Sequence, residues 1–263
     1  VSGAMLRAED VRMEFGGIVA LDRAGVEVTP GRVVGLIGRN GSGKSTLFNC
    51  ITGFLKPTSG RITLDGRDIC GHAPHEIVRA GVARTFQTPR VDLRATVRDA
   101  VLCGLFSSKK KSFTSAVLGL PASLAEEREL RRRADAGIRQ LGLDAWADTE
   151  IGKLSMGCVR MVEVARAMAA SARYLLLDEP AAGLGRDEHE VLAREIRKLA
   201  DAGIGVLLVE HNFALIRLLC DTVTVLDSGR VLLTAPPAEI ERDEQVLRLY
   251  LGAAADAVPL AAA

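Results

Sequence analysis

The chain has 263 residues, of which 48% are hydrophobic and 25% are charged. This is ordinary globular composition, which excludes a largely disordered chain. A formal net charge of +1 and an aromatic content of 4% provide neither the broad basic field nor the stacking surface of nucleic-acid binders, so no nucleic-acid partner is expected. No apolar run approaches the length of about eighteen residues that a membrane-spanning helix needs, so any role at a membrane would be played from the water side.

The first part of the chain reads as short β-rich segments. Alternation at residues 26–28 and a continuous apolar run at 33–37 predict strands, the second buried on both faces. A glycine-rich loop follows at 38–43, and residues 44–53 predict a helix. Residues 61–64 predict a further strand because a turn signal follows them.

Between about residues 88 and 160 the β-branched runs thin out and charged residues with helically spaced apolar positions predict a helical insertion. Apolar runs return at 174–177 and 206–209, with a helical stretch at 187–202 between them, and residues 223–233 read as a hairpin. Strands alternating with helices indicate an α/β fold with a mostly parallel sheet. We expect an antiparallel β portion at the N-terminus and an inserted α-helical subdomain.

The loop that follows the run at 33–37 fits the pattern GxxxxGK[ST]. Its glycines let backbone N–H groups approach phosphate oxygens, and the helix after it points its positive end at the same anion. Lys44 supplies an ammonium for the outer phosphates, and the Ser45 hydroxyl is a hard oxygen ligand for Mg²⁺. The expected nucleotide-binding residues are therefore Gly38, Arg39, Asn40, Gly41, Ser42, Gly43, Lys44, Ser45 and Thr46.

Two carboxylates, Asp178 and Glu179, follow the apolar run at 174–177. Ligands of open α/β sheets bind at the carboxyl ends of strands, so both acids are expected to face the nucleotide. Asp178 is placed to hold Mg²⁺, and Glu179 to orient or deprotonate a water. A P-loop alone does not choose between kinases, GTPases, motors and transporters, but the guanine-reading NKxD motif is absent from this chain.

Residues 154–158, Leu-Ser-Met-Gly-Cys, resemble the LSGGQ signature of ABC transporter ATPases. Ser155 lies 23 residues before Asp178 and opens a predicted helix that it can cap. With the P-loop and the acidic pair, the chain resembles this family over nearly its whole length. The resemblance implies a P-loop NTPase (RecA-like) core that binds and hydrolyses ATP. It also implies that Ser155 and Gly157 contact the γ-phosphate of ATP held by a second ATPase subunit.

Three further residues fall in the order of the family. Phe15 matches the aromatic that stacks on adenine, Gln87 the glutamine that senses Mg²⁺ and water, and His211 the switch histidine on the γ-phosphate. The resemblance thus implies a catalytic set of Glu179, His211, Gln87 and Lys44, and metal ligands Ser45, Gln87 and Asp178.

The signature departs from the family pattern at two positions. Cys158 replaces the usual glutamine, and Met156 a glycine or tyrosine. Because Ser155 and Gly157 are retained, hydrolysis is expected to survive at a reduced rate or with weaker dimer closure.

We divide the chain accordingly. Residues 1–87 and 161–240 are assigned to the nucleotide-binding core, 88–160 to the helical subdomain with the signature motif, and 241–263 to a C-terminal tail.

Several segments resemble the ATPases of branched-chain amino acid importers, among them 15–17, 83–87, 181–184, 210–212 and 250–252. This implies a peripheral protein at the cytoplasmic face of the membrane, docked on permease subunits that receive their solute from a solute-binding protein. The second ATPase subunit could be identical, although those importers commonly pair two different ones. The alternatives are an ATPase of a urea or amide importer, an ATPase of lipopolysaccharide export, a soluble ABC-type regulator, or a scaffold that binds ATP without hydrolysing it.

Overall fold

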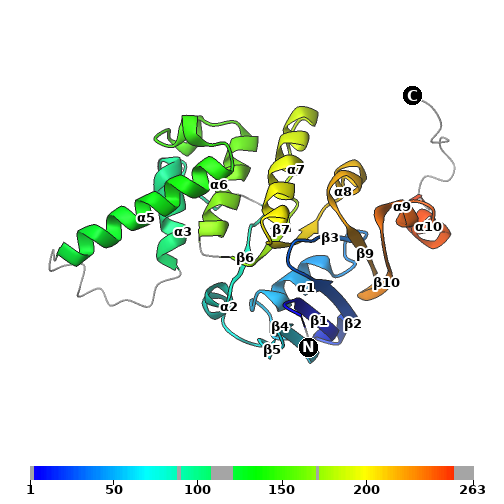
Figure 1. The fold of residues 1–263 in the computed structure, drawn as a ribbon. Helices are drawn as coiled ribbons and strands as arrows, with labels where there is room; N and C mark the ends of the chain where they lie inside the picture. The colour runs from blue at the N-terminus through cyan, green and yellow to red at the C-terminus, as the bar shows by residue number, and fades with distance from the viewer. Residues whose placement is uncertain (1–2, 88–89, 108–120, 170–171, 252–263) are drawn as a thin grey trace.

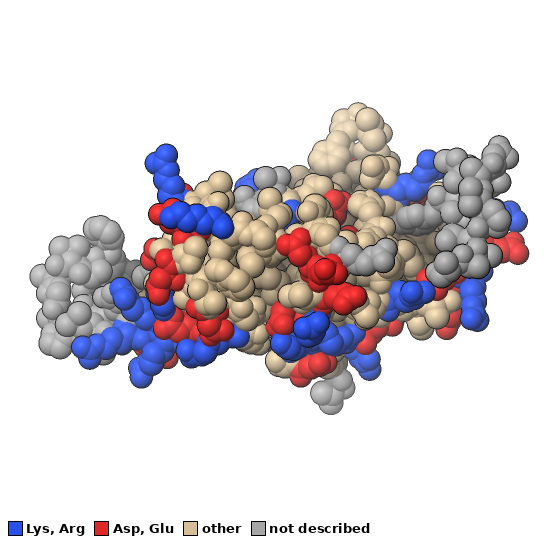
Figure 2. All heavy atoms as spheres, turned by 90° about the horizontal axis from the view of Figure 1, so that it is seen from above, with Lys and Arg blue, Asp and Glu red and all other residues tan. Residues whose placement is uncertain are grey.

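The computed structural model describes residues 3–87, 90–107, 121–169 and 172–251 (Figure 1). None of the helices formed by these residues is long and apolar enough to cross a membrane. On the face shown in Figure 2, acidic and basic side chains are interspersed.

The N-terminal part forms an antiparallel sheet in the order β2-β1-β4-β5. Its strands are β1 (Leu6–Phe15), β2 (Ile18–Val28), β4 (Ser59–Leu64) and β5 (Arg67–Asp68). Burial in β1 largely alternates along the strand, as expected of a sheet with one face on the core and one in water. The predicted antiparallel portion is therefore present.

The central sheet has the order β10-β9-β3-β8-β7-β6 and is parallel except at β10. Its strands are β3 (Val33–Ile37), β6 (Val82–Arg84), β7 (Tyr174–Asp178), β8 (Gly205–Val209), β9 (Thr222–Asp227) and β10 (Arg230–Ala235). All residues of β3, β7 and β8 are buried, which explains why these strands read as continuous apolar runs in the sequence.

Helices cover both faces of this sheet and form a separate group at one end. The helices around the sheets are α1 (Lys44–Ile51), α2 (Pro74–Ala80), α7 (Arg186–Asp201), α8 (Phe213–Leu219), α9 (Pro237–Ile240) and α10 (Glu244–Leu251). The group at the left of Figure 1 is the predicted helical insertion. It comprises α3 (Val97–Ser107), α5 (Pro121–Gln140), the short 3-10 turns Asp144–Trp146 and Ile151–Lys153, and α6 (Met156–Ala169).

Two apolar clusters hold these layers together, and alternate residues of β3 contribute to each. Val34 and Leu36 belong to the cluster of the antiparallel sheet and α1. Val33 and Ile37 belong to the cluster that also contains the buried residues of α3, α5 and α6. The helical insertion thus shares a core with one face of the central sheet. Each fully buried aliphatic side chain contributes about 1.5–3 kcal/mol, so this shared core fixes the insertion firmly.

The boundary expected between residues 160 and 161 falls inside α6, which runs on to Ala169. This helix therefore belongs to both segments and does not separate them. Of the expected C-terminal tail, residues 252–263 lie outside the described residues, and so does the stretch 108–120 of the insertion. The α/β P-loop architecture, with its antiparallel portion and helical subdomain, is confirmed.

Candidate active site at the strand ends

The predicted phosphate loop connects the end of β3 to the start of α1. Gly41 and Gly43 have φ of 81° and 103°, the left-handed region that favours glycine. Space is a second constraint, because a Cβ on Gly38 would lie 2.2 Å from the carbonyl oxygen of Leu226, and one on Gly43 would lie 2.7 Å from Leu21 Cδ2. The glycines thus let the loop pack tightly against two neighbouring strands.

The ammonium of Lys44 lies inside this loop. Its Nζ donates hydrogen bonds to the carbonyl oxygens of Gly38 at 2.7 Å and of Arg39 at 3.0 Å. Burial lowers the pKa of Lys44, while the negative charges of Glu179 and Asp178 oppose that shift. The cation is therefore held where the loop curves, with two carboxylates close enough to affect its charge.

Asp178 at the end of β7 is held by an arginine from the neighbouring strand. Arg84 Nη2 donates to Asp178 Oδ2 at 2.8 Å, and the two side chains are 9% and 11% exposed. The guanidinium also donates to Asn49 Oδ1 of α1 at 2.6 Å. It lies over the rings of Phe48 and Phe86, 5.4 and 5.2 Å from their centroids. β6, β7 and α1 thus meet at one buried ion pair.

Glu179 is the centre of a second hydrogen-bonded group. Gln87 Nε2 donates to its Oε2 at 2.8 Å, and His211 Nε2 lies 2.8 Å from its Oε1. The backbone of Glu179 is in the left-handed region at φ 47°, which is strained for a residue with a side chain. Its N–H donates to the carbonyl oxygen of Val209 at 2.9 Å, which ties this turn to β8. The carboxylate is thus aimed by its backbone and by two side chains.

The buried carboxylate of Glu210 supports the same edge of the sheet. It accepts hydrogen bonds from the backbone N–H of Ala181 at 2.9 Å and of His211 at 3.1 Å. Burial raises the pKa of Glu210, and these hydrogen bonds work in the opposite direction. Glu210 therefore joins the turn after Glu179 to the segment that carries His211.

Arg84 and Glu210 are missing from the site that the sequence predicts. Both stand in segments used only for the family resemblance, 83–87 and 210–212. The available signal was a charged residue directly at the end of an apolar run, at the same sheet edge as the acidic pair.

The residues expected to hold a metal line one cavity of about 400 Å³. Its lining comprises Ser45, Asn49, Phe54, Arg84, Phe86, Gln87, Arg90 and Asp178. A hydroxyl, an amide and a carboxylate oxygen are the hard donors that Mg²⁺ takes, usually together with water and phosphate oxygens. The donor set therefore fits Mg²⁺.

Phe15, Ser155 and Gly157 belong neither to the phosphate loop nor to the strand ends of the central sheet. Phe15 ends β1 and is half-exposed, on the hairpin whose residues Ala20 and Leu21 contact Gly43 of the phosphate loop. Ser155 precedes α6, and its Oγ accepts a hydrogen bond from the N–H of Cys158 at 3.3 Å, as the predicted cap requires. The signature segment thus lies on the helical subdomain (Figure 1).

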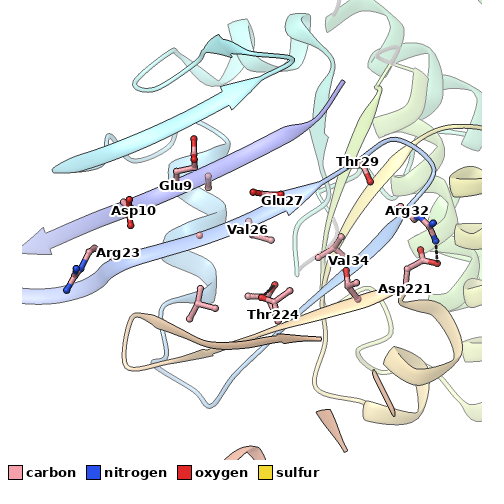
Figure 3. A pocket seen from close by; sticks show the side chains of 15 residues that line it. Glu9, Asp10, Arg23, Val26, Glu27, Thr29, Arg32, Val34, Asp221 and Thr224 are labelled. Atoms are coloured by element: carbon pink, nitrogen blue, oxygen red, sulfur yellow. Dashed lines mark hydrogen bonds and ion pairs between the residues drawn. The ribbon is translucent and has the colours of Figure 1, made fainter. Parts of the chain in front are cut away.

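A larger cavity, of about 840 Å³, lies elsewhere, between the antiparallel sheet and β9 and β10 (Figure 3). Its lining mixes acidic residues such as Glu9 and Glu27 with Arg23, Arg32 and threonines. It contains none of the predicted site residues. Volume alone therefore does not identify the active site of this chain.

Known proteins resemble this chain over nearly its whole length. The family described as ABC transporter matches residues 21–182. The chain is 36% identical to the high-affinity branched-chain amino acid transport ATP-binding protein BraF of Pseudomonas aeruginosa, over 97% of this chain and 100% of that protein. It is also 36% identical to the lipopolysaccharide export system ATP-binding protein LptB of Acidithiobacillus ferridurans, over 94% of this chain and 97% of that protein.

A solved ATP-binding cassette of an ABC transporter, in its ADP conformation, superposes with a TM-score of 0.84 at 31% identity, over 95% of this chain and 99% of that one. The fold and the phosphate loop first define the chain as a P-loop NTPase. The chain belongs to the ABC transporter family, as a nucleotide-binding ATPase subunit.

Proposed function

We propose that this subunit energises the uptake of branched-chain amino acids from the cytoplasmic face of the membrane. It would dock on permease subunits that receive their solute from a solute-binding protein. The observation that carries its motor role is the convergence of Lys44, Asp178, Glu179, Gln87 and His211 at one edge of the central sheet.

In the proposed reaction, Lys44 offsets charge on the outer phosphates of ATP. Glu179 orients the attacking water and accepts its proton, while Gln87 and His211 hold the carboxylate in place. Ser45, Asp178 and Gln87 would hold Mg²⁺, which supplies charge neutralisation for the phosphates when bound.

The half of the site formed by Phe15 and the phosphate loop would bind ATP in one subunit, and the start of α6 in a second subunit would complete it. A helix N-terminus is an anion site, so Ser155 and Gly157 are suited to the γ-phosphate of that ATP. Two sites related by a twofold axis would then close together and pull on the permease. In the complete transporter we expect the second subunit to be a different ATPase, whereas the isolated subunit would pair with a second copy of itself.

Mixing two inactive variants tests this sharing of the site between subunits. Lys44→Ala removes the phosphate cation, and Ser155→Arg blocks the start of α6, so neither protein alone should release phosphate from ATP. A mixed dimer keeps one intact site, and an equal mixture should therefore recover about a quarter of the wild-type rate. A mixture no more active than the two variants separately would contradict a site built from two subunits.

The name of the BraF relative supports the proposed solute. The test is uptake of labelled leucine, isoleucine and valine by proteoliposomes that contain this subunit, its permeases and the solute-binding protein. ATP-dependent uptake that disappears with Glu179→Gln is expected. Uptake of urea or short amides in place of the amino acids would assign the subunit to the related importers.

Lipopolysaccharide export is the second candidate, because the LptB relative is as similar in identity as BraF is. Isolation of the subunit with its natural membrane partners would separate the two. Permeases with an amino acid binding protein support import, whereas permeases that stimulate ATP hydrolysis on addition of lipopolysaccharide support export. A soluble regulator would co-purify with no permease.

A further inference from the structure

The start of α6 is covered by a carboxylate of the same chain. Glu188 belongs to the first turn of α7, and its Oε1 lies 2.6 Å from the position that a Cβ on Gly157 would occupy. The hydroxyl of Ser155 and the N–H of Gly157 lie close enough to this carboxylate to lower the pKa of Glu188. The two residues expected to bind a phosphate therefore already face an anionic group.

Glu188 is held in this position by its own helix. Its Oε2 accepts a hydrogen bond from the N–H of Gly185 at 3.0 Å, which closes the first turn of α7. The hydrogen bond from Gly185, with the Ser155 hydroxyl and the Gly157 N–H nearby, holds the pKa of Glu188 below its usual value, so the group is charged at neutral pH. One carboxylate thus links the start of α7 to the start of α6.

A phosphate at the start of α6 would compete with this carboxylate for the same donors. The N–H groups of the first turn of a helix have no partner within the helix, and the positive end of its dipole attracts one anion at a time. Glu188 Oε1 lies against Gly157, on the side to which a Cβ would point. A γ-phosphate brought to Ser155 and Gly157 would therefore meet the charge of Glu188.

We propose that Glu188 is an internal competitor that occupies the start of α6 in the resting subunit and gives way to the phosphate of the partner's nucleotide. The proposal rests on the proposed function, in which that phosphate binds there. The proposal implies a higher ATP requirement for dimer formation, because two subunits pair around ATP only when ATP binding offsets the loss of the contact between α6 and α7.

The first test measures ATP-driven dimer formation. Glu188→Gln is made in a Glu179→Gln background, where hydrolysis does not dissolve the dimer. Glutamine keeps a carbonyl oxygen for the cap on Gly185 and loses the charge. The matched control is Glu190→Gln, the same change at an exposed position of the same helix.

Analytical ultracentrifugation should show that Glu188→Gln reaches half-maximal dimer at about two- to fivefold less ATP than the control. An unchanged or higher requirement would contradict competition, because a residue that merely positioned Ser155 would weaken the dimer when altered. Absence of ATP binding in every variant would instead overturn the proposed function together with this proposal.

The second test needs neither nucleotide nor dimer. Hydrogen exchange of the backbone amides at residues 155–160 is compared in Glu188→Ala and Glu190→Ala proteins without ATP. The amides at the start of α6 lose the neighbouring carboxylate only in the first variant, so exchange there should become faster only in that protein. Equal exchange in both would show that Glu188 does not cover the helix start in solution, and the proposal would fall even if ATP hydrolysis were normal.

Discussion

The strand ends of the central sheet and the start of α6 are both charged sites satisfied from within the chain, but by different means. At the strand ends, Asp178 pairs with Arg84 in a nearly buried network that joins three elements. At α6, Glu188 reaches from the surface of α7 to Gly157. A buried pair is costly to break, whereas a contact open to water exchanges easily. The first region is therefore preassembled, and the second is suited to changing partners.

Breaking the buried pair should have the largest effect on stability. Arg84→Met leaves the Asp178 carboxylate without its cation, which is expected to lower the free energy of unfolding by about 3 kcal/mol. Urea denaturation checks this against Arg90→Met, because Arg90 also lies over the Phe86 ring, at 4.4 Å, but is exposed. Equal losses in the two variants would mean that the ion pair adds nothing beyond the ring contact. Adding Asp178→Asn to Arg84→Met should recover part of the loss.

The next largest effect concerns the ammonium in the phosphate loop. Lys44→Ala removes charge-assisted hydrogen bonds to the phosphates, so ATP affinity should fall about 10- to 100-fold. Calorimetric titration of ATP measures this, and Lys56→Ala, at an exposed position in the loop after α1, is the control. Wild-type affinity in Lys44→Ala would contradict the role given to this residue, and the preassembled region would then lack its nucleotide.

A smaller loss of ATP affinity should follow removal of the aromatic ring at the end of β1. Phe15→Ala deletes a surface on which adenine can stack, worth about 1 kcal/mol, or about a fivefold change in Kd. Ile18→Ala is the matched control on the same turn, since Ile18 is more exposed still. If both variants bound ATP as the wild type does, adenine would lie elsewhere on the strand-end region.

The smallest effects should appear in the pH dependence of stability, with opposite signs in the two regions. The pKa of Glu210 is raised in the folded state, so its contribution is fully present below its unfolded pKa and is lost as pH rises through the folded pKa. The pKa of Glu188 is lowered, so its contribution is present above its unfolded pKa and is lost as pH falls through the folded pKa.

Unfolding curves between about pH 3 and 7, a range that extends to both sides of the usual carboxyl pKa of about 4.3, check these signs. Relative to Glu210→Gln, the wild type should gain stability on acidification, and relative to Glu188→Gln it should lose stability. Slopes of the same sign for both carboxylates would remove the distinction between a buried support and a surface contact.

Much of this fold could be predicted, because strands, helices and turns leave patterns among residues that are neighbours in the sequence. The apolar run at 33–37 forms β3 with the same bounds, and a helix begins at Lys44 directly after the glycine-rich loop. The predicted site residues Lys44, Asp178, Glu179, Gln87 and His211 do lie together, since the carboxyl ends of parallel strands share an edge.

The partners of those residues could not be predicted in the same way. Arg84 reaches Asp178 because β6 lies beside β7 with Arg84 opposite Leu176, a register that no local period encodes. Glu188 reads in the sequence as a capping residue of its own helix. Only the packing of α7 against α6 turns it toward Gly157.

The most direct measurement of the central claim compares phosphate release and ATP binding in the wild type and Glu179→Gln. If Glu179 activates water at a site that Lys44 and Asp178 complete, the variant should bind ATP as the wild type does and release phosphate at least about 100-fold more slowly. Phosphate release by Glu179→Gln at nearly the wild-type rate would contradict the account.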